Sequence, residues 1–133
     1  MDTIQKLRPE GLVNSPAFSH VAVVPPGATT IYVGGQDSVD ADGKLVGEGD
    51  VAAQSVRALQ NVVTALAAAG ATLDDVIHFT VLFVDGEDLA AGYGAIAPRL
   101  ASDNPALVTA ALVPALAVQG ALVEINAVAA VMR

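Results

Sequence analysis

The chain has 133 residues, a length typical of one domain, and 53% of them are hydrophobic. This share excludes an intrinsically disordered chain, which lacks the apolar residues needed for a core. We expect no membrane span, because the longest apolar run near the C-terminus, Ala110 to Val118, is shorter than the ~20 residues that cross a bilayer. No apolar segment follows Lys6 and Arg8, so no export signal is expected either.

Fourteen acidic and six basic residues give a formal net charge of −8, which argues against nucleic acid as a partner. The chain has no Cys, which excludes disulfides, thiolate nucleophiles and Cys-based metal sites and is compatible with a cytoplasmic location. Most apolar residues are small or β-branched, as in closely packed layers. For so small a domain, this apolar share predicts burial against other subunits.

The first part of the chain predicts turns and short strands. Residues 1–19 show no periodicity and are expected to form an arm. Two strand candidates follow at 20–24 and 29–33, and the Pro25-Pro26-Gly27 turn between them predicts a hairpin. Residues 37–50 are rich in Asp and Gly and should form a loop.

A helix is predicted between Asp50, a plausible N-cap, and Gly70, which suits a left-handed C-terminal cap. Its expected buried stripe is Ala52, Val56, Leu59, Val63 and Leu66. Most polar residues, Gln54 and Asn61 among them, are expected to lie off that stripe.

Alternating apolar residues predict a strand over 76–84, and a second helix should begin beside Asp85 and Asp88. Its stripe is Leu89, Tyr93, Ile96 and Leu100, and Pro98 should kink or end it near Ala97.

Two further strands are predicted at 106–113 and 121–131. The order β-β-α-β-α-β-β indicates an α+β domain over 1–133, with one mixed sheet and two helices on one face. The other face of the sheet is also apolar, and subunit packing is the simplest cover for it.

No strong catalytic motif is visible. Neither His20 nor His78 has a second His nearby, so no metal site is expected, although either could meet a carboxylate in space. The acidic residues of the 37–50 loop lack the spacing of a calcium loop and favour a solvated segment; they are Asp37, Asp40, Asp42, Glu48 and Asp50.

Two features could carry chemistry. Gly34-Gly35 after a strand could bring the main chain close to a ligand, although a double Gly is also common in bulges and turns. Glu124 interrupts an apolar strand, where a raised pKa would suit proton transfer. The alternative is a Glu at the sheet rim in solvent, and the strand pattern does not decide between the two.

Several segments in order resemble the reactive intermediate deaminase family, RidA or YjgF. They are Ser15-Pro16-Ala17-Phe18-Ser19-His20, Ile31-Tyr32-Val33-Gly34-Gly35-Gln36, the loop 40–46, the helix and turn 54–75, and Gly120-Ala121-Leu122-Val123-Glu124-Ile125 with the residues after it. The resemblance covers about residues 9 to 131. It implies a chorismate-mutase-like protomer in a homotrimer, small-molecule clefts between subunits, and no cofactor or metal.

The family's best-known activity is hydrolysis of enamines and imines, such as 2-aminoacrylate, to a keto acid and ammonia. By resemblance, Glu124 positions the attacking water, while Phe18, Gly34, Gly35 and Thr109 line the cleft. Two positions depart from the family: Leu107 stands where an Arg grips the substrate carboxylate, and Tyr93 replaces a frequent Asn.

Loss of the Arg should weaken carboxylate binding by ~2–5 kcal/mol. Arg57 and Arg99 are not expected to replace it, because the family places both helices outside, away from the cleft.

Three functions remain to be compared. One is a deaminase with altered specificity and weak or no activity on 2-aminoacrylate. Another is a non-catalytic trimeric protein that binds a small metabolite. The third is the older family label of endoribonuclease or translation inhibitor, which the net charge of −8 disfavours.

Overall fold

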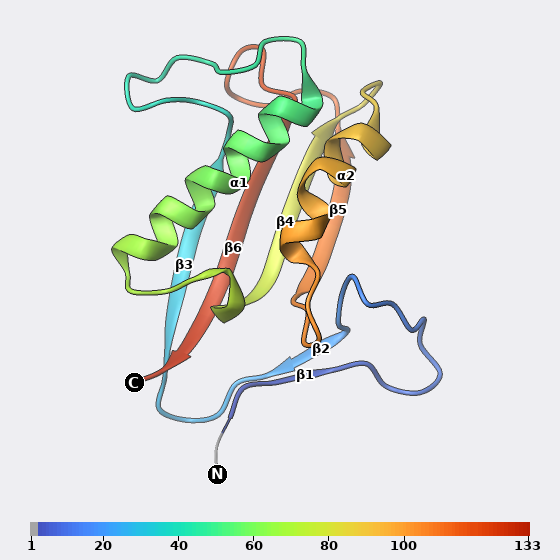
Figure 1. Cartoon of the computed structure of the whole chain (residues 1–133), viewed down its shortest axis with the longest axis vertical. Helices are drawn as coiled ribbons and strands as arrows, with labels where there is room; N and C mark the ends of the chain where they lie inside the picture. Colours follow the sequence, from blue (N-terminus) through green and yellow to red (C-terminus); the bar gives the residue numbers. More distant parts are fainter. Residues whose placement is uncertain (1–2) are drawn as a thin grey trace.

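The computed structural model describes residues 3–133 (Figure 1). Its elements in chain order are β1 (Gln5–Leu7), β2 (Val21–Val23), β3 (Ala28–Gln36), α1 (Val51–Ala68), the 3-10 helix η1 (Leu73–Asp75), β4 (Val76–Val84), α2 (Leu89–Leu100), β5 (Leu107–Val113) and β6 (Val123–Met132). A four-stranded sheet has the order β3-β6-β4-β5, and both long helices cover the same face of it (Figure 1). The predicted α+β class is therefore confirmed.

The sheet is mixed because β6 runs antiparallel to both β3 and β4, whereas β4 and β5 are parallel. The crossover between the parallel strands contains α2, as such a connection requires. Alternate residues of β4 and β6 point toward the helices and are buried; they are Phe79, Val81, Phe83, Val123, Ile125 and Ala127. The sequence pattern places Ile77 in this row, but a shift in register between Val76 and His78 leaves it outside.

Both predicted caps of α1 are confirmed. Asp50 Oδ1 accepts a hydrogen bond from Ala53 N at 3.0 Å, and Gly70 has a φ of +74°. The predicted buried stripe was partly wrong, because Gln54 is fully buried while Val56 remains 48% exposed.

Gln54 can be buried because its amide is satisfied on both sides. Its Nε2 donates to Gly47 O at 3.1 Å and to Gly120 O at 3.2 Å, and its Oε1 accepts from Leu122 N at 2.9 Å. One side chain thus joins α1 to the two loops at that end of the sheet. Apolar periodicity alone does not reveal such a residue.

The predicted hairpin was wrong. β2 pairs with β1 in a small antiparallel sheet, while β3 pairs with β6 from Ala28↔Met132 onward. Figure 1 shows the chain turning away between β2 and β3. The long ladder with β6 offers β3 far more hydrogen bonds than the three-residue β2 could. The predicted arm thus contains a strand too short for a periodic pattern, and its residues 1–2 lie outside the described part of the chain.

Of the two outcomes expected at Pro98, a kink or an end near Ala97, the end was wrong. Helix α2 continues through Pro98 to Leu100, and Ala101 N donates to Ala97 O at 3.0 Å. Pro98 lacks one main-chain donor, but Ile96 and Leu100 are both buried. Their burial against the core stabilises the last turn despite that missing hydrogen bond.

The burial of Gln54 leads to a stability prediction. Gln54→Ala leaves Gly120 O and Leu122 N without partners and should lower the free energy of unfolding by ~2–4 kcal/mol. Urea denaturation at fixed protein concentration measures this difference. Gln60→Ala, on the exposed side of the same helix, is the matched control and should change it by less than ~0.5 kcal/mol. Equal losses for both variants would contradict the anchoring role.

Candidate functional site

Polar side chains gather on the face of the sheet opposite the helices, which we call the helix-free face. The strand register places Glu124 beside Leu82, Asn126 beside Thr80, and Thr80 beside Thr109. These residues alternate with the buried, helix-facing ones along each strand. Glu124 therefore lies on a surface that a ligand or a second chain can reach.

The position of Glu124 depends on a break in the ladder between β3 and β6. The register shifts between Val33 and Gln36, so Gly34 and Gly35 form an irregular stretch. A Cβ atom added to Gly35 would lie 2.7 Å from both Cδ and Oε2 of Glu124. The carboxyl group therefore rests against the main chain of Gly35, and a side chain at this position would displace it.

Asp37, which follows this irregular stretch, lies beside Glu124. Its side chain is only 8% exposed, and its Oδ1 is buried without a hydrogen-bond partner. Burial, followed by the charge of Glu124 and a hydrogen bond with its carboxyl, raises the pKa of Asp37 from 3.8 to about 6. The expectation of a solvated acid at this position was therefore wrong. No sequence pattern pointed to the pair, because its members are far apart along the chain.

The segment that carries Asp37 is fixed to α1. Asn61 Nδ2 donates to Asp37 O at 3.0 Å and to Val39 O at 2.9 Å, and Asn61 Oδ1 accepts from Arg57 Nε at 3.1 Å. Ser38 is fully buried and donates to Val46 O at 2.6 Å. Asp37 is thus positioned by a network of hydrogen bonds, and Arg57 is part of that network.

Three other predicted site residues cluster near the start of β5. Leu107 pairs with His78 in the sheet and forms an isolated bridge with Ser19, which follows Phe18. Thr109 Oγ1 lies 2.8 Å from His78 Nε2, so the two side chains are hydrogen-bonded between β5 and β4.

The rings of Phe18 and His20 meet edge to face, with centroids 5.5 Å apart. Besides this contact, His20 Nε2 lies 2.7 Å from Val13 O. Phe18, Leu107 and Thr109 therefore lie in one region of the fold.

This region is separate from Glu124 within one chain. Glu124 lies level with Leu82 and Ala111, and Leu107 is four positions before Ala111 on β5. At 3.3 Å per residue this is roughly 13 Å along the strand direction, with β4 in between. Leu107 and Glu124 therefore do not contact each other within one chain.

Tyr93 is a residue of α2 and lies apart from both other groups, beside the edge strand β5. There it lines an apolar groove of about 300 Å³ with Phe83, Leu89, Ala110, Ala111 and Leu112. Burial raises the pKa of Tyr93. The structure thus separates the seven predicted site residues into three groups.

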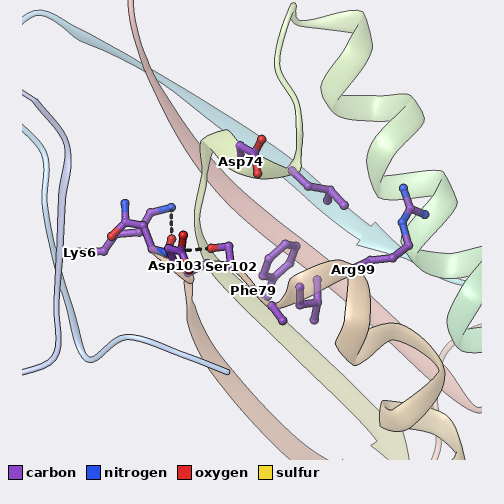
Figure 2. Close-up of a pocket in the computed structure, with 11 residues that line it drawn as sticks. Lys6, Asp74, Phe79, Arg99, Ser102 and Asp103 are labelled. Atoms are coloured by element: carbon purple, nitrogen blue, oxygen red, sulfur yellow. Dashed lines mark hydrogen bonds between the residues drawn. The ribbon is translucent and has the colours of Figure 1, made fainter. Parts of the chain in front are cut away.

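A cavity of about 330 Å³ below the end of α2 contains none of these seven residues (Figure 2). Phe79 lies near its centre, and Lys6 and Asp74 approach from different sides (Figure 2). Lys6 Nζ donates to Asn104 O at 3.3 Å, and burial lowers the pKa of Lys6 while Asp74 and Asp75 oppose that shift. Arg99 also borders this cavity, which places it on the helix side of the sheet.

Within residues 3–133, no three His, Cys, Asp or Glu side chains are grouped in a way that could hold a metal ion. Over the same range, no helix is long and apolar enough to cross a bilayer.

Comparison with known proteins identifies the class to which this fold and face belong. The family model described as Endoribonuclease L-PSP matches residues 12–131. The chain belongs to this family, which is also known as the YjgF or Rid family.

Particular relatives agree with this assignment. A protein of unknown function of the Rid family, YyfB from Yersinia pestis, is 30% identical, with a TM-score of 0.84 over 96% of this chain and 98% of that one. RidA from an Antarctic Psychrobacter is 28% identical, with a TM-score of 0.68 over 98% and 100% of the two chains. A RutC family protein of Pyrococcus abyssi is 37% identical over 60 residues, which are 45% of this chain and 47% of that relative. The match thus spans about half the length of this curated relative.

The raised pKa of Asp37 predicts how stability depends on pH. Because the folded-state pKa is about 6 and the ordinary value is 3.8, Asp37 favours the folded state at low pH. Its contribution is lost as pH rises through this interval. Asp37→Asn should therefore gain free energy of unfolding relative to wild type between pH 4 and pH 7, by on the order of 1 kcal/mol after solvent screening.

Urea denaturation across this pH range measures the difference. Asp42 is an exposed acid in the same loop, and Asp42→Asn is the control. Its free energy of unfolding should change with pH as that of the wild type does. If the free energies of unfolding of Asp37→Asn and wild type differ by a constant amount over this pH range, the raised pKa of Asp37 is contradicted.

Proposed function

We propose that this protein is a hydrolytic deaminase of imine or enamine metabolites, with a specificity different from that of 2-aminoacrylate deaminases. The observation that carries the proposal is the Glu124 carboxyl, which lies on the helix-free face against the main chain of Gly35. A fixed carboxyl beside main-chain polar groups can orient a water molecule and accept its proton. The family assignment supports the same chemistry.

The altered specificity rests on Leu107. An apolar side chain cannot replace the two-pronged hydrogen bonding of Arg to a carboxylate. Arg57 donates to Asn61, and Arg99 borders the cavity on the other side of the sheet, so neither serves as a substitute. We therefore expect weak or no hydrolysis of 2-aminoacrylate.

A homotrimer is part of this proposal. The separation of Leu107 from Glu124 within one chain supports a cleft between subunits, with Phe18, Leu107 and Thr109 on one side and Gly34, Gly35 and Glu124 on the other. The ring of Tyr32 on β3, which is 79% exposed on the helix-free face, supports the burial of this surface in an assembly. We also propose a cytoplasmic location, with which the absence of Cys is compatible.

The alternative is a trimeric protein that binds a small metabolite without chemistry. The apolar groove beside Tyr93, about 300 Å³ in volume, supports this alternative, because it could hold a small apolar ligand without any acid or base.

Glu124→Gln separates the two functions. We expect the wild type to accelerate ammonia release from imines made in situ by an amino-acid oxidase, tested over a panel of side chains. Loss of the general base should reduce that acceleration by about 100-fold or more. The control is Glu48→Gln, an exposed acid in the loop before α1, which should retain full activity. No acceleration by the wild type with any imine would favour the binding protein.

Leu107→Arg tests the specificity. If the cleft otherwise retains the family geometry, this change should strengthen binding of small keto acids such as pyruvate by about tenfold or more. Isothermal titration calorimetry measures the affinity. Val56→Arg adds the same charge at an exposed position of α1 and should leave the affinity unchanged. No gain for Leu107→Arg, or an equal gain for both variants, would show that position 107 does not face the ligand.

A further inference from the structure

Asp37, the buried neighbour of Glu124, has no role in the proposed function. The two carboxyls come from different elements, the loop after β3 and the strand β6, and meet where Gly34 and Gly35 present no side chain between them. Asp37 is more than nine-tenths buried, and its Oδ1 has no hydrogen-bond partner. An unsatisfied buried carboxyl oxygen beside a second carboxyl is costly unless a proton or a ligand compensates for it.

The charged groups around Asp37 do not supply that compensation. From β6 the facing group is Glu124, which has the same sign of charge. On α1, Arg57 directs its Nε to Asn61, and Asn61 contacts only the main chain of the Asp37 segment. Within the loop, Asp40 accepts hydrogen bonds from the main-chain nitrogens of Asp42 and Lys44.

Other basic residues are occupied elsewhere. Lys6 donates to Asn104 O, Arg8 to Ser15 O and Asp103 O, and Arg133 to Ala69 O. The helix-free face thus carries an acid pair at one level of the sheet and the apolar Leu107 at another. This distribution of charge favours a ligand that brings a positive charge or hydrogen-bond donors.

We propose that Asp37 and Glu124 share one proton and together select ligands that carry a protonated amine or imine and no carboxylate. The proposal rests on the proposed function in one respect, that Glu124 faces the ligand. It adds Asp37 as a residue that determines specificity and names the substrate class as imines derived from amines rather than from amino acids.

The pair also suits both proton transfers of the reaction R₂C=NH₂⁺ + H₂O → R₂C=O + NH₄⁺. As the water oxygen bonds to the imine carbon, an ionised carboxylate takes the water proton. A protonated carboxyl then gives a proton to the nitrogen of the carbinolamine. The C–N bond breaks as the hydroxyl oxygen forms the carbonyl, its proton passes to the ionised carboxylate, and the released ammonia takes up that proton as NH₄⁺. Two carboxyls that hold one proton between them provide both forms at once.

The first experiment tests the pair without reference to catalysis. The side-chain carboxyls of the ¹³C-labelled protein are titrated by NMR, with Asp37 and Glu124 assigned through their variants. We expect Asp37 to titrate near pH 6 in the wild type and at a lower pH in Glu124→Gln. Asp42→Asn should leave the titration of Asp37 unchanged. The same midpoint for Asp37 in wild type and in Glu124→Gln would overturn the pair.

The second experiment tests the ligand class with benzylammonium and benzoate, which share a ring and differ in charge. Chemical-shift titration should show binding of benzylammonium in preference to benzoate. The preference should fall by about tenfold in Asp37→Asn and persist in Asp42→Asn. Benzoate binding as tightly as benzylammonium, or absence of benzylammonium binding, would overturn the proposed selectivity.

A matched pair of imines separates this inference from the proposed function. Benzylamine with an amine oxidase and phenylglycine with an amino-acid oxidase give imines that differ by one carboxylate. Faster hydrolysis of the imine from benzylamine supports both proposals, and faster hydrolysis of the imine from phenylglycine overturns the inference while the deaminase function stands. If neither imine is hydrolysed faster than in buffer, but benzylammonium binds through Asp37, the selectivity stands and the deaminase function fails.

Discussion

The arrangement of the helix-free face depends on the break in the β3–β6 ladder at Gly34 and Gly35. On the observed backbone a side chain at position 35 would occupy the space of the Glu124 carboxyl, since an added Cβ would lie 2.7 Å from it. Glycine leaves that space free, and Asp37 follows the irregular stretch and lies beside Glu124. A local loss of sheet hydrogen bonding thus creates a place for two carboxyls.

Two polar residues of α1 fix the segments that carry these two carboxyls. Gln54 connects the helix to Gly47, Gly120 and the main chain just before β6, and Asn61 connects it to the segment of Asp37. The helix that covers the core therefore also positions both carboxyl-bearing segments. A site of this kind is rigid because its supports belong to regular secondary structure.

Much of the fold could be predicted from the sequence, because it follows from local patterns. Strand β4 was predicted with its observed bounds, and Asp50 and Gly70 defined the ends of α1, since caps and periodicity act over a few residues. The pairing of β2 and the passage of α2 through Pro98 were predicted wrongly. Both depend on distant partners: β1 for the strand, and the buried surroundings of Ile96 and Leu100 for the helix.

The sequence by itself determined the family and the α+β class, because both depend on residue identity in order along the chain. By resemblance it also predicted that Leu107 replaces a base. It also singled out Glu124 as a charge within an apolar strand. Only the tertiary structure decided that Glu124 has Asp37 as its neighbour and that Leu107 lies at another level of the sheet. The reason is physical: burial, strand register and the approach of two carboxyls depend on segments that folding brings together from distant parts of the chain.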